Sequence, residues 1–264
     1  MPKPNARQEQ ILELVQRQGY ASVEALSQRF GVTPQTVRRD INQLSEMSLV
    51  QRYHGGAGIA SSVENVSYTT RQVLCLEEKR RIADLVASHI PDNASLFINI
   101  GTTTEEVAKS LLDHSGLRVI TNNLNVASIM CSNPDFEVIV AAGVVRARDR
   151  GIIGEATIDL ISQFKVDYGI VGISGIDLDG VLLDFDYREV RVAQAIMDNS
   201  RRVYLATDHT KFGRNAMVRL GDIDQISALF TDRAPPKSIE KRLSESGVEL
   251  FVAPPQGSLN NDED

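Results

Sequence analysis

The side chains best suited to contact DNA share one face of a predicted helix over residues 33–44. That face combines two guanidinium groups with two amides, from Gln35, Arg38, Arg39 and Asn42. Guanidinium and amide groups bind base edges and phosphates in a major groove. The opposite face carries a narrow apolar stripe, formed by Val37, Ile41 and Leu44. The spacing predicts a recognition helix that packs on a small core and presents its polar face to DNA.

Two residues mark the start of this helix. The Thr33 hydroxyl can accept a hydrogen bond from a first-turn N–H group. Pro34 fits the first helical position, because its missing N–H group is not needed there. Thr36 lies one turn after the cap. We therefore expect Thr33 and Thr36 to accompany the four polar side chains at the DNA.

Two shorter helices are predicted before the recognition helix, over residues 7–18 and 23–30, and Ser22 is expected to cap the second. Gly31-Val32 forms the turn that follows them. Residues 48–56 predict a strand, a basic and aromatic tip, and a glycine turn. The tip side chains expected to reach DNA are Arg52, Tyr53 and His54. The order of these elements predicts a winged helix-turn-helix domain over residues 1–57. A three-helix bundle is the alternative, since paired arginines often form only a solvated face.

Charge is distributed unevenly along the chain. Residues 1–56 carry seven Lys/Arg and five Asp/Glu, a net of +2, whereas the whole chain is −7, which leaves −9 on the remainder. An acidic protein needs a local basic surface to bind DNA, because phosphate contacts dominate the affinity. The acidic remainder is therefore expected to lie away from the duplex. One small module offers few base contacts, which predicts a homo-oligomer, a dimer or tetramer, on repeated half-sites of double-stranded operator DNA.

The composition excludes several other classes of protein. No stretch approaches the roughly 18 apolar residues that span a membrane, and residues 1–5 lack the apolar core of a signal peptide. We therefore expect a cytoplasmic protein with no membrane partner. Cys75 and Cys131 have no metal-binding spacing and are expected to be buried or partly buried free thiols. With only four histidines, the chain predicts no metal site and no cofactor.

The remainder of the chain divides into a linker, a larger domain and a tail. Residues 58–75 are small and polar without a sustained period, which predicts a linker. Residues 76–253 alternate apolar runs with amphipathic segments, and residues 254–264 form a polar acidic tail. Strands are expected at 96–100, 118–121, 137–141, 168–173, 202–206, 226–230 and 249–252. Helices are expected at about 76–90, 103–112, 124–131, 154–164, 187–199 and 237–245. This βα pattern predicts an α/β effector domain with a mainly parallel sheet.

Polar and glycine residues follow five of the predicted strands. The carboxyl ends of parallel strands meet at one edge of a sheet, where ligands bind. Residues 101–103 open directly onto a helix, whose first-turn N–H groups and dipole suit a phosphate, and Lys211 can supply the opposing charge. The predicted effector-binding residues are Gly101, Thr102, Thr103, Asn122, Gly143, Gly172, Ser174, Asp208 and Lys211. For any single loop, an ordinary strand-to-helix turn with a threonine cap is the alternative.

Several motifs resemble the DeoR family of bacterial transcriptional regulators. They are Thr-x-x-Thr-Val-Arg-Arg-Asp at 33–40, Tyr-His-Gly-Gly at 53–56, Ile-Gly-Thr-Thr at 100–103, Thr-Asn-Asn at 121–123 and Asp-x-x-Lys-Phe at 208–212. The resemblance covers essentially residues 7 to 252. It implies an N-terminal DNA-binding domain and an effector domain related to sugar-phosphate isomerases, glucosamine-phosphate deaminases and CoA transferases. It also implies that the effector is a phosphorylated sugar or polyol.

Longer runs within the effector domain are similar to family members that repress glycerol and glycerol 3-phosphate catabolic genes. These runs are residues 121–127, 151–157, 172–177 and 211–218. The similarity implies repression that is relieved by a phosphorylated small molecule, with glycerol 3-phosphate expected first. Asn99 and Ala142 depart from the family, which often has Asp and Gly there. The first departure removes a negative charge beside the pocket, and the second narrows the approach to the backbone.

Three alternatives to a repressor that responds to glycerol 3-phosphate differ in the effector or in the class of protein. The protein could respond to another sugar phosphate. It could be an isomerase-like enzyme, with Asp208 as general base and Lys211 as anion holder. It could also be a structural DNA-binding protein without a ligand. An isomerase needs neither a recognition helix nor a wing, and the polar strand ends argue for a ligand, so a repressor without enzymatic activity is predicted.

Overall fold

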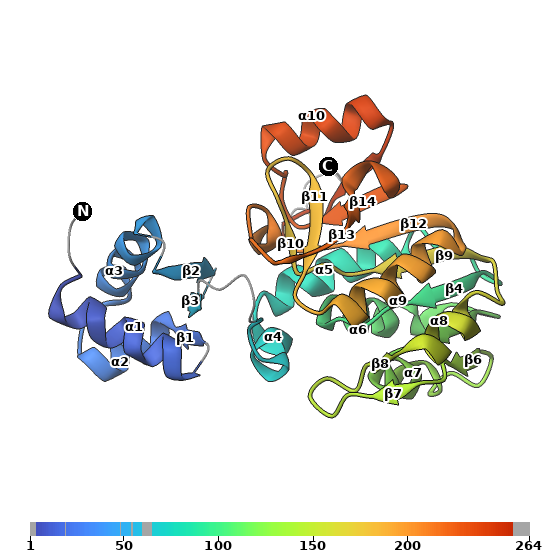
Figure 1. The fold of residues 1–264 in the computed structure, drawn as a ribbon, viewed down its shortest axis with the longest axis horizontal. Coiled ribbons are helices and arrows are strands. Elements are labelled where there is room, and N and C mark those ends of the chain that lie inside the picture. Colours follow the sequence, from blue (N-terminus) through green and yellow to red (C-terminus); the bar gives the residue numbers. More distant parts are fainter. Residues whose placement is uncertain (1–3, 19, 48, 54, 60–64, 256–264) are drawn as a thin grey trace, which may run out of the picture. The chain divides into compact units, whose positions relative to one another are not determined.

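The computed structural model describes residues 4–18, 20–47, 49–53, 55–59 and 65–255. The chain divides into two compact units, Met1–Cys75 and Leu76–Asp264, here termed the N-terminal and C-terminal units (Figure 1). Each unit contains its own clusters of buried apolar side chains. Two separate cores mean that each unit can position its own functional surface.

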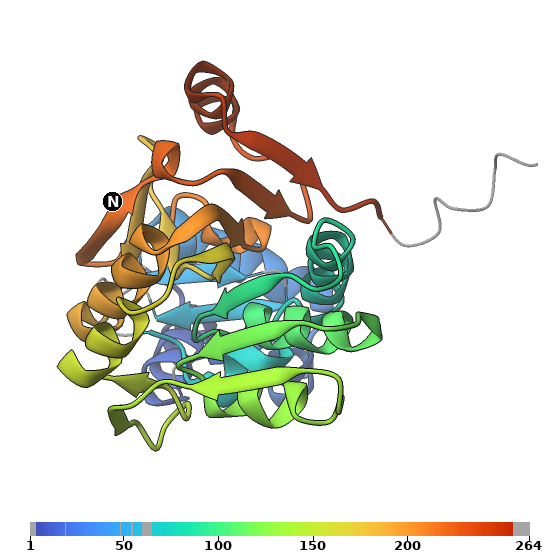
Figure 2. The ribbon, with the colours of Figure 1, turned by 90° about the vertical axis from the view of Figure 1, so that its right-hand side faces the viewer.

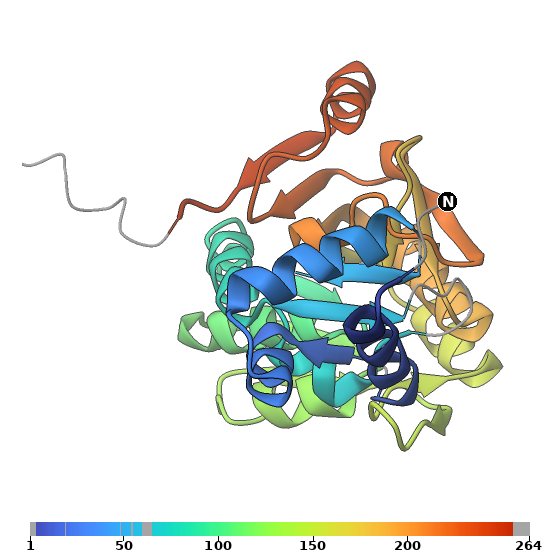
Figure 3. The same ribbon diagram turned by 90° about the vertical axis from the view of Figure 1, so that its left-hand side faces the viewer.

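The N-terminal unit combines helices with a small antiparallel sheet. Its elements are α1 (Ala6–Gln18), β1 (Tyr20–Ser22), α2 (Val23–Phe30), α3 (Pro34–Glu46), β2 (Val50–Tyr53), β3 (Gly56–Ile59) and α4 (Tyr68–Val73). The sheet has the order β1-β3-β2, with antiparallel pairing throughout, and α3 contacts β2 (Figure 3). This is the predicted helix-turn-helix with a wing, to which β1 adds a strand that the sequence analysis missed. The predicted linker over 58–75 contains the end of β3 and all of α4.

Local signals in the sequence fix the helix boundaries of this unit. Ser22 Oγ accepts the N–H group of Ala25 at 3.0 Å, and Thr33 Oγ1 accepts that of Thr36 at 3.3 Å. Both helices therefore begin at the residues expected to cap them. Gly31 ends α2 with φ of 61°, a left-handed conformation that glycine adopts without steric cost.

The C-terminal unit is built on a seven-stranded parallel sheet. Its strands are β4 (Ser95–Ile98), β5 (Arg118–Thr121), β6 (Glu137–Val140), β9 (Val166–Val171), β12 (Ser200–Ala206), β14 (Ala228–Thr231) and β15 (Glu249–Val252). Their order is β15-β14-β12-β9-β4-β5-β6. Every neighbouring pair is parallel. All seven predicted strands are confirmed, and so is the predicted α/β class of this unit.

Helices cover both faces of this sheet (Figure 2). One face packs on α5 (Leu76–Ala87), α6 (Thr102–Ser110) and α7 (Leu124–Met130). The other packs on α8 (Glu155–Ile161), α9 (Tyr187–Asp198) and α10 (Lys237–Ser246). Alternate strand residues point to opposite faces, so that Leu96 and Ile98 join one core and Phe97 the other. The result is a three-layer α/β/α arrangement.

Short antiparallel strands accompany the main sheet and were not predicted. They are β7 (Val144–Val145), β8 (Ile152–Ile153), β10 (Gly175–Ile176), β11 (Val181–Asp184) and β13 (Val218–Asp222). β7 pairs with β8, and β10, β11 and β13 form a three-stranded sheet. The expectation for the thiols is wrong for Cys131, which is exposed, while Cys75 is of intermediate exposure.

Replacing Leu44 tests the core of the N-terminal unit. Leu44 is fully buried in that core, so Leu44→Ala should destabilise the unit by about 2–5 kcal/mol through lost burial and a residual cavity. Hydrogen exchange followed by mass spectrometry should then accelerate in α1, β1 and β3 but not in β4 or β9. Leu49→Ala is the control, because Leu49 is 37% exposed. Equal acceleration in both units would show that they do not fold separately.

Candidate DNA interface and effector site

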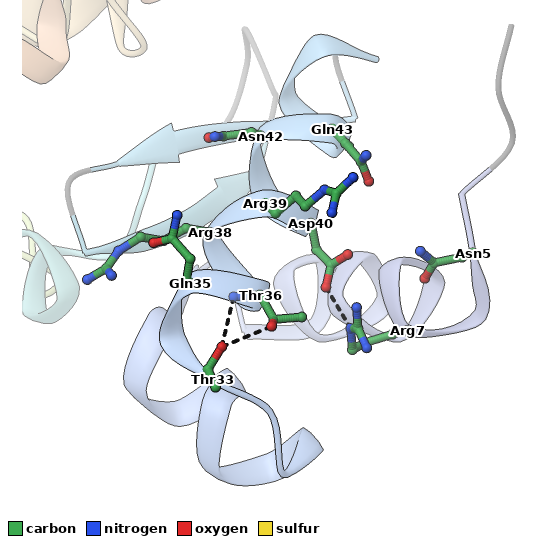
Figure 4. Close-up of a pocket in the computed structure, with 10 residues that line it drawn as sticks. All are labelled: Asn5, Arg7, Thr33, Gln35, Thr36, Arg38, Arg39, Asp40, Asn42 and Gln43. Carbon is green, nitrogen blue, oxygen red and sulfur yellow. Dashed lines mark hydrogen bonds and ion pairs between the residues drawn. The ribbon is translucent and has the colours of Figure 1, made fainter.

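The polar face of α3 lines a groove in the N-terminal unit (Figure 4). The groove residues are Asn5, Arg7, Thr33, Gln35, Thr36, Arg38, Arg39, Asp40, Asn42 and Gln43. The six helix residues predicted to contact DNA are therefore brought together on one surface. Thr33, Gln35, Arg38 and Arg39 are exposed, and Thr36 and Asn42 are partly buried. Figure 4 shows Gln35 and Arg38 on one side of α3 and Arg39 and Gln43 on the other.

The apolar side of α3 anchors this surface. Val37, Ile41 and Leu44 are at most 2% exposed and belong to the core of the N-terminal unit. Asn42 has a more enclosed position than expected, because its Oδ1 atom is buried without a hydrogen-bond partner among the described residues. Its amide has less freedom to meet a base edge than those of the exposed side chains.

A buried carboxylate that was not predicted from the sequence connects α3 to α1. Asp40 is 3% exposed. Its Oδ2 atom accepts a hydrogen bond from Arg7 Nε at 2.6 Å, and its Oδ1 atom accepts one from Gln8 Nε2 at 3.3 Å. Gln8 Nε2 also donates to Gln43 Oε1 at 2.5 Å. This network holds the recognition helix at a fixed position on α1.

The wing supplies fewer candidate contacts than predicted. Arg52 is exposed on β2. Tyr53, however, is only 4% exposed, and its ring packs edge-to-face on Tyr20 with 6.0 Å between the ring centroids. This burial speaks against the predicted DNA contact of Tyr53, because the aromatic ring completes the local core instead. His54 lies outside the described residues.

The strand order places the predicted effector residues in a row along one edge of the main sheet. Asp208, Gly172, Gly101, Asn122 and Gly143 follow the neighbouring strands β12, β9, β4, β5 and β6, respectively. Neighbouring strands lie about 4.8 Å apart, so the row spans about 19 Å. A small phosphorylated metabolite is shorter than this. The residues therefore share an edge, but one ligand cannot contact all of them.

The start of α6 is suited to an anion. Gly101 is the N-cap residue, with φ of 155° and ψ of 148°, and no side chain caps the helix. Thr102 and Thr103 are each 7% exposed. Because no side chain of a described residue caps this helix, its first-turn N–H groups remain available to a phosphate. Gly172 lies beside this turn, since a Cβ atom there would be 3.7 Å from Thr104 Cγ2.

A buried ion pair lies two strands away from this turn. Lys211 Nζ is 3.6 Å from Asp208 Oδ2, and the two side chains are 14% and 1% exposed. Burial alone would raise the pKa of Asp208, but the Lys211 charge, hydrogen bonds from Thr210 and the Lys79 charge together lower it to about 2. Asp208 is therefore ionised at neutral pH and holds the Lys211 ammonium group near the strand ends.

Lys79 is the principal effector-site candidate that the sequence analysis missed. This lysine lies on α5 and is 2% exposed. It shares the buried face of that helix with Ile82, Ala83 and Val86, and α5 contacts β12 and β14. The sequence does contain a signal for this residue, because Lys79 falls on the apolar face of its helix. A lysine on such a face indicates an anionic partner, since a lysine is rarely buried without one.

Three side-chain oxygens at this edge are buried without a hydrogen-bond partner among the described residues. They are Asn122 Oδ1, Thr207 Oγ1 and Thr231 Oγ1. Buried polar groups are nearly always hydrogen-bonded, so each calls for a partner. The Asn122 amide nitrogen donates to Ile152 O at 3.1 Å, which orients that side chain. These oxygens fit an edge that binds a polar ligand or ordered water.

Two other predicted residues have structural roles that explain them without a ligand. Ser174 Oγ donates to Asp184 Oδ1 at 3.0 Å, and Ser174 O accepts Arg214 Nη1 at 3.0 Å. Gly143 has φ of 140°, and a Cβ atom there would lie 2.3 Å from Thr157 Oγ1. Glycine is thus required at 143 by packing and backbone conformation.

The described residues contain no group of three or more His, Cys, Asp or Glu side chains that could hold a metal ion. Among the described helices, none combines the length and the apolar character of a membrane span.

A winged helix-turn-helix joined to an α/β unit with an anion-suited edge defines a DNA-binding transcriptional regulator. Residues 7–63 match the DeoR-like helix-turn-helix domain, and residues 75–233 match the DeoR C terminal sensor domain. The chain belongs to the DeoR family and is a DeoR-type transcriptional repressor.

Relatives with described functions align over nearly the whole chain. The glycerol-3-phosphate regulon repressor of Escherichia coli (strain K12) is 53% identical over 94% of this chain and 98% of its own length. The HTH-type transcriptional repressor CsqR of the same organism is 44% identical over 94% of this chain and 95% of its own length. Among solved structures, ribose 5-phosphate isomerase A of Methanocaldococcus jannaschii aligns over about half of this chain. It is 10% identical, with a TM-score of 0.39 over 52% of this chain and 55% of its own.

The acid stability of the protein tests the charged state of Asp208. The pKa is about 2 in the folded protein and about 3.9 in an unfolded chain. A lowered pKa gives stabilisation that is present above pH about 4 and is lost as the pH falls toward 2. The difference in unfolding free energy between wild type and Asp208→Asn should therefore shrink over this range, measured by urea unfolding. A difference that does not change with pH would show that Asp208 is not a stabilised carboxylate.

Proposed function

We propose that this protein represses genes of glycerol or glycerol 3-phosphate catabolism and that glycerol 3-phosphate is its effector. The similarity of nearly the whole chain to the glycerol-3-phosphate regulon repressor of Escherichia coli supports the regulon. The uncapped start of α6 beside a row of buried polar strand ends supports a phosphorylated ligand and is the observation that carries the proposal. We infer a cytoplasmic location, where operator DNA and phosphorylated metabolites are found.

The ligand is proposed to occupy the middle of the strand edge. Gly101, Thr102 and Thr103 bind the phosphate through first-turn N–H groups and hydroxyls. Asp208 holds the ammonium group of Lys211 toward the same ligand. The buried ammonium group of Lys79 adds a second positive charge near Asp208. Gly172 leaves room beside the turn, while Asn122 offers its Oδ1 acceptor to a ligand hydroxyl. Gly143 and Ser174 are left out, because packing and internal hydrogen bonds explain them.

The proposed DNA contacts come from the polar face of α3 and the exposed part of the wing. They are Thr33, Gln35, Thr36, Arg38, Arg39, Asn42 and Arg52. A homo-oligomer would present two or more such faces to repeated half-sites. The effector relieves repression to the extent that it binds one arrangement of the units more tightly than the other, with a coupling of about 1–3 kcal/mol.

An enzymatic role is disfavoured by the state of Asp208. A general base works best with a pKa near the operating pH. The pKa of Asp208 is lowered to about 2, and the carboxylate is buried beside Lys211. This residue is therefore a weak base that positions a cation. Incubating the protein with sugar phosphates and observing turnover would contradict the assignment as a non-enzyme.

Substitutions on α3 test the DNA-binding face. Arg38→Ala or Arg39→Ala should weaken operator binding by about 1–3 kcal/mol where the guanidinium group contacts a base, with loss of preference for that base. Binding is measured by fluorescence anisotropy on operator and random duplexes. Arg29→Ala is the matched control, because Arg29 is an exposed arginine on α2 outside the groove. Unchanged affinity in both α3 variants, with the fold intact, would exclude this helix from the interface.

Substitution of Lys211 tests the effector site. Lys211→Met should remove a charge-assisted contact and lower the affinity for glycerol 3-phosphate by about one to two decades. DNA affinity without effector should be preserved, so that the variant represses but no longer responds. Calorimetric titration measures the affinity, with thermal unfolding to verify folding and Lys241→Met, an exposed lysine on α10, as control. Equal affinities would place the ligand elsewhere, and no binding to wild type at millimolar concentration would exclude this effector.

A further inference from the structure

The groove beside α3 has a second wall formed by the start of α1. Asn5 and Arg7 lie on this wall, opposite the residues of the recognition helix (Figure 4). The Arg7 side chain is 33% exposed. Its Nε atom is bound to Asp40 at 2.6 Å, whereas Nη1 and Nη2 make no hydrogen bond with any described residue. Arg7 therefore keeps donors that no described residue uses, on a partly exposed side chain in a groove that otherwise carries proposed DNA contacts.

Arg7 is held in place by Asp40, whose carboxylate is itself fixed by Gln8. Asp40 accepts its Nε–H group, and the second oxygen of that carboxylate is bound by Gln8. Gln8 is itself fixed by a reciprocal cap: its N–H group donates to Asn5 Oδ1, and its Oε1 accepts the N–H group of Asn5, both at 3.0 Å. A long side chain usually loses rotamer freedom when it binds. Here much of that ordering is already present before any ligand arrives.

The charge of the groove favours a polyanion. Arg7, Arg38 and Arg39 bring three guanidinium groups to it, and the side chain of its one carboxylate residue, Asp40, is only 4% exposed. The other lining side chains are hydroxyls and amides. Solvent therefore meets positive charge and neutral polar groups, while the negative charge lies beneath them. The 13-residue α1 also begins at this wall, so the positive end of its dipole adds to the same field.

We propose that Arg7 binds a backbone phosphate of the DNA and that Asp40 is its positioning residue. The proposal rests on the placement of α3 in the major groove stated above. A recognition helix in the major groove has a phosphate backbone on each side, and side chains beside such a helix bind phosphate oxygens. The terminal donors of Arg7 suit two phosphate oxygens. A phosphate contact fixes the register of the protein on DNA but carries no sequence information.

The salt dependence of DNA binding tests this assignment. Arg7→Gln should reduce the slope of log K against log salt by about one, since each phosphate contact contributes about 0.9. Affinity should fall by the same factor on a duplex carrying a selected high-affinity site and on a random duplex of equal length. Lys241→Gln is the matched control, because it removes one exposed positive charge from the C-terminal unit. The control should leave the slope unchanged.

Two further variants distinguish a direct phosphate contact by Arg7 from the positioning role of Asp40. Arg7→Lys keeps the charge and should restore the slope, although with lower affinity because the fork geometry is lost. Asp40→Asn should lower the affinity while keeping the slope, since Arg7 remains charged but is less well positioned. An unchanged slope in folded Arg7→Gln would overturn the proposal and leave Arg7 as a structural partner of Asp40. If Arg38→Ala and Arg39→Ala also left binding intact, the placement of α3 itself would be wrong.

Discussion

Parallel pairing of the seven main strands is the constraint on which the C-terminal unit depends. It brings the carboxyl ends of β12, β9, β4 and β5 to one edge, although the residues that follow them are far apart in the sequence. It also requires helices on both faces, which the two buried clusters provide. The uncapped start of α6 and the buried pair of Asp208 and Lys211 lie along the same edge, two strands apart, only because of that strand order.

Both units use a buried carboxylate to hold a cation at a surface suited to anions. In the N-terminal unit Asp40 binds Arg7, and in the C-terminal unit Asp208 binds Lys211. Burying a charge is costly unless it is paired, so each carboxylate fixes its partner firmly. The cation is therefore ordered before DNA or effector binds, which lowers the entropic cost of binding. Preorganisation by buried acids is a common feature of the two proposed sites.

The sequence predicted those parts of the fold that depend on local patterns. Apolar runs identified all seven main strands, and Ser22 and Thr33 marked helix starts correctly. β11 and β13, with four and five residues, are no shorter than several main strands, and they were missed because their pairing depends on tertiary contacts. β7, β8 and β10 were missed because two residues carry too little periodicity. β1 was missed for the same reason, since its three residues lie directly between two helices.

The sites were predicted less completely than the fold. Residue types at strand ends indicated the edge, but only the strand order shows that Gly143 lies too far from Asp208 to share one small ligand. Lys79 and Asp40 were missed because charged residues are expected on solvated faces, and both are buried. Tyr53 was expected at the surface because it follows a basic residue in the wing, whereas its ring completes the core against Tyr20.

Hydrogen exchange with and without glycerol 3-phosphate tests the central claim most directly, because it reports the backbone N–H groups that are proposed to bind the phosphate. Added effector should slow exchange in residues 101–105 at the start of α6 and in residues 207–212 after β12. Residues 6–18 of α1, in the N-terminal unit, serve as an internal reference, because they are not proposed to contact the effector. Saturating effector that leaves 101–105 unchanged while protecting another region would contradict the proposed site.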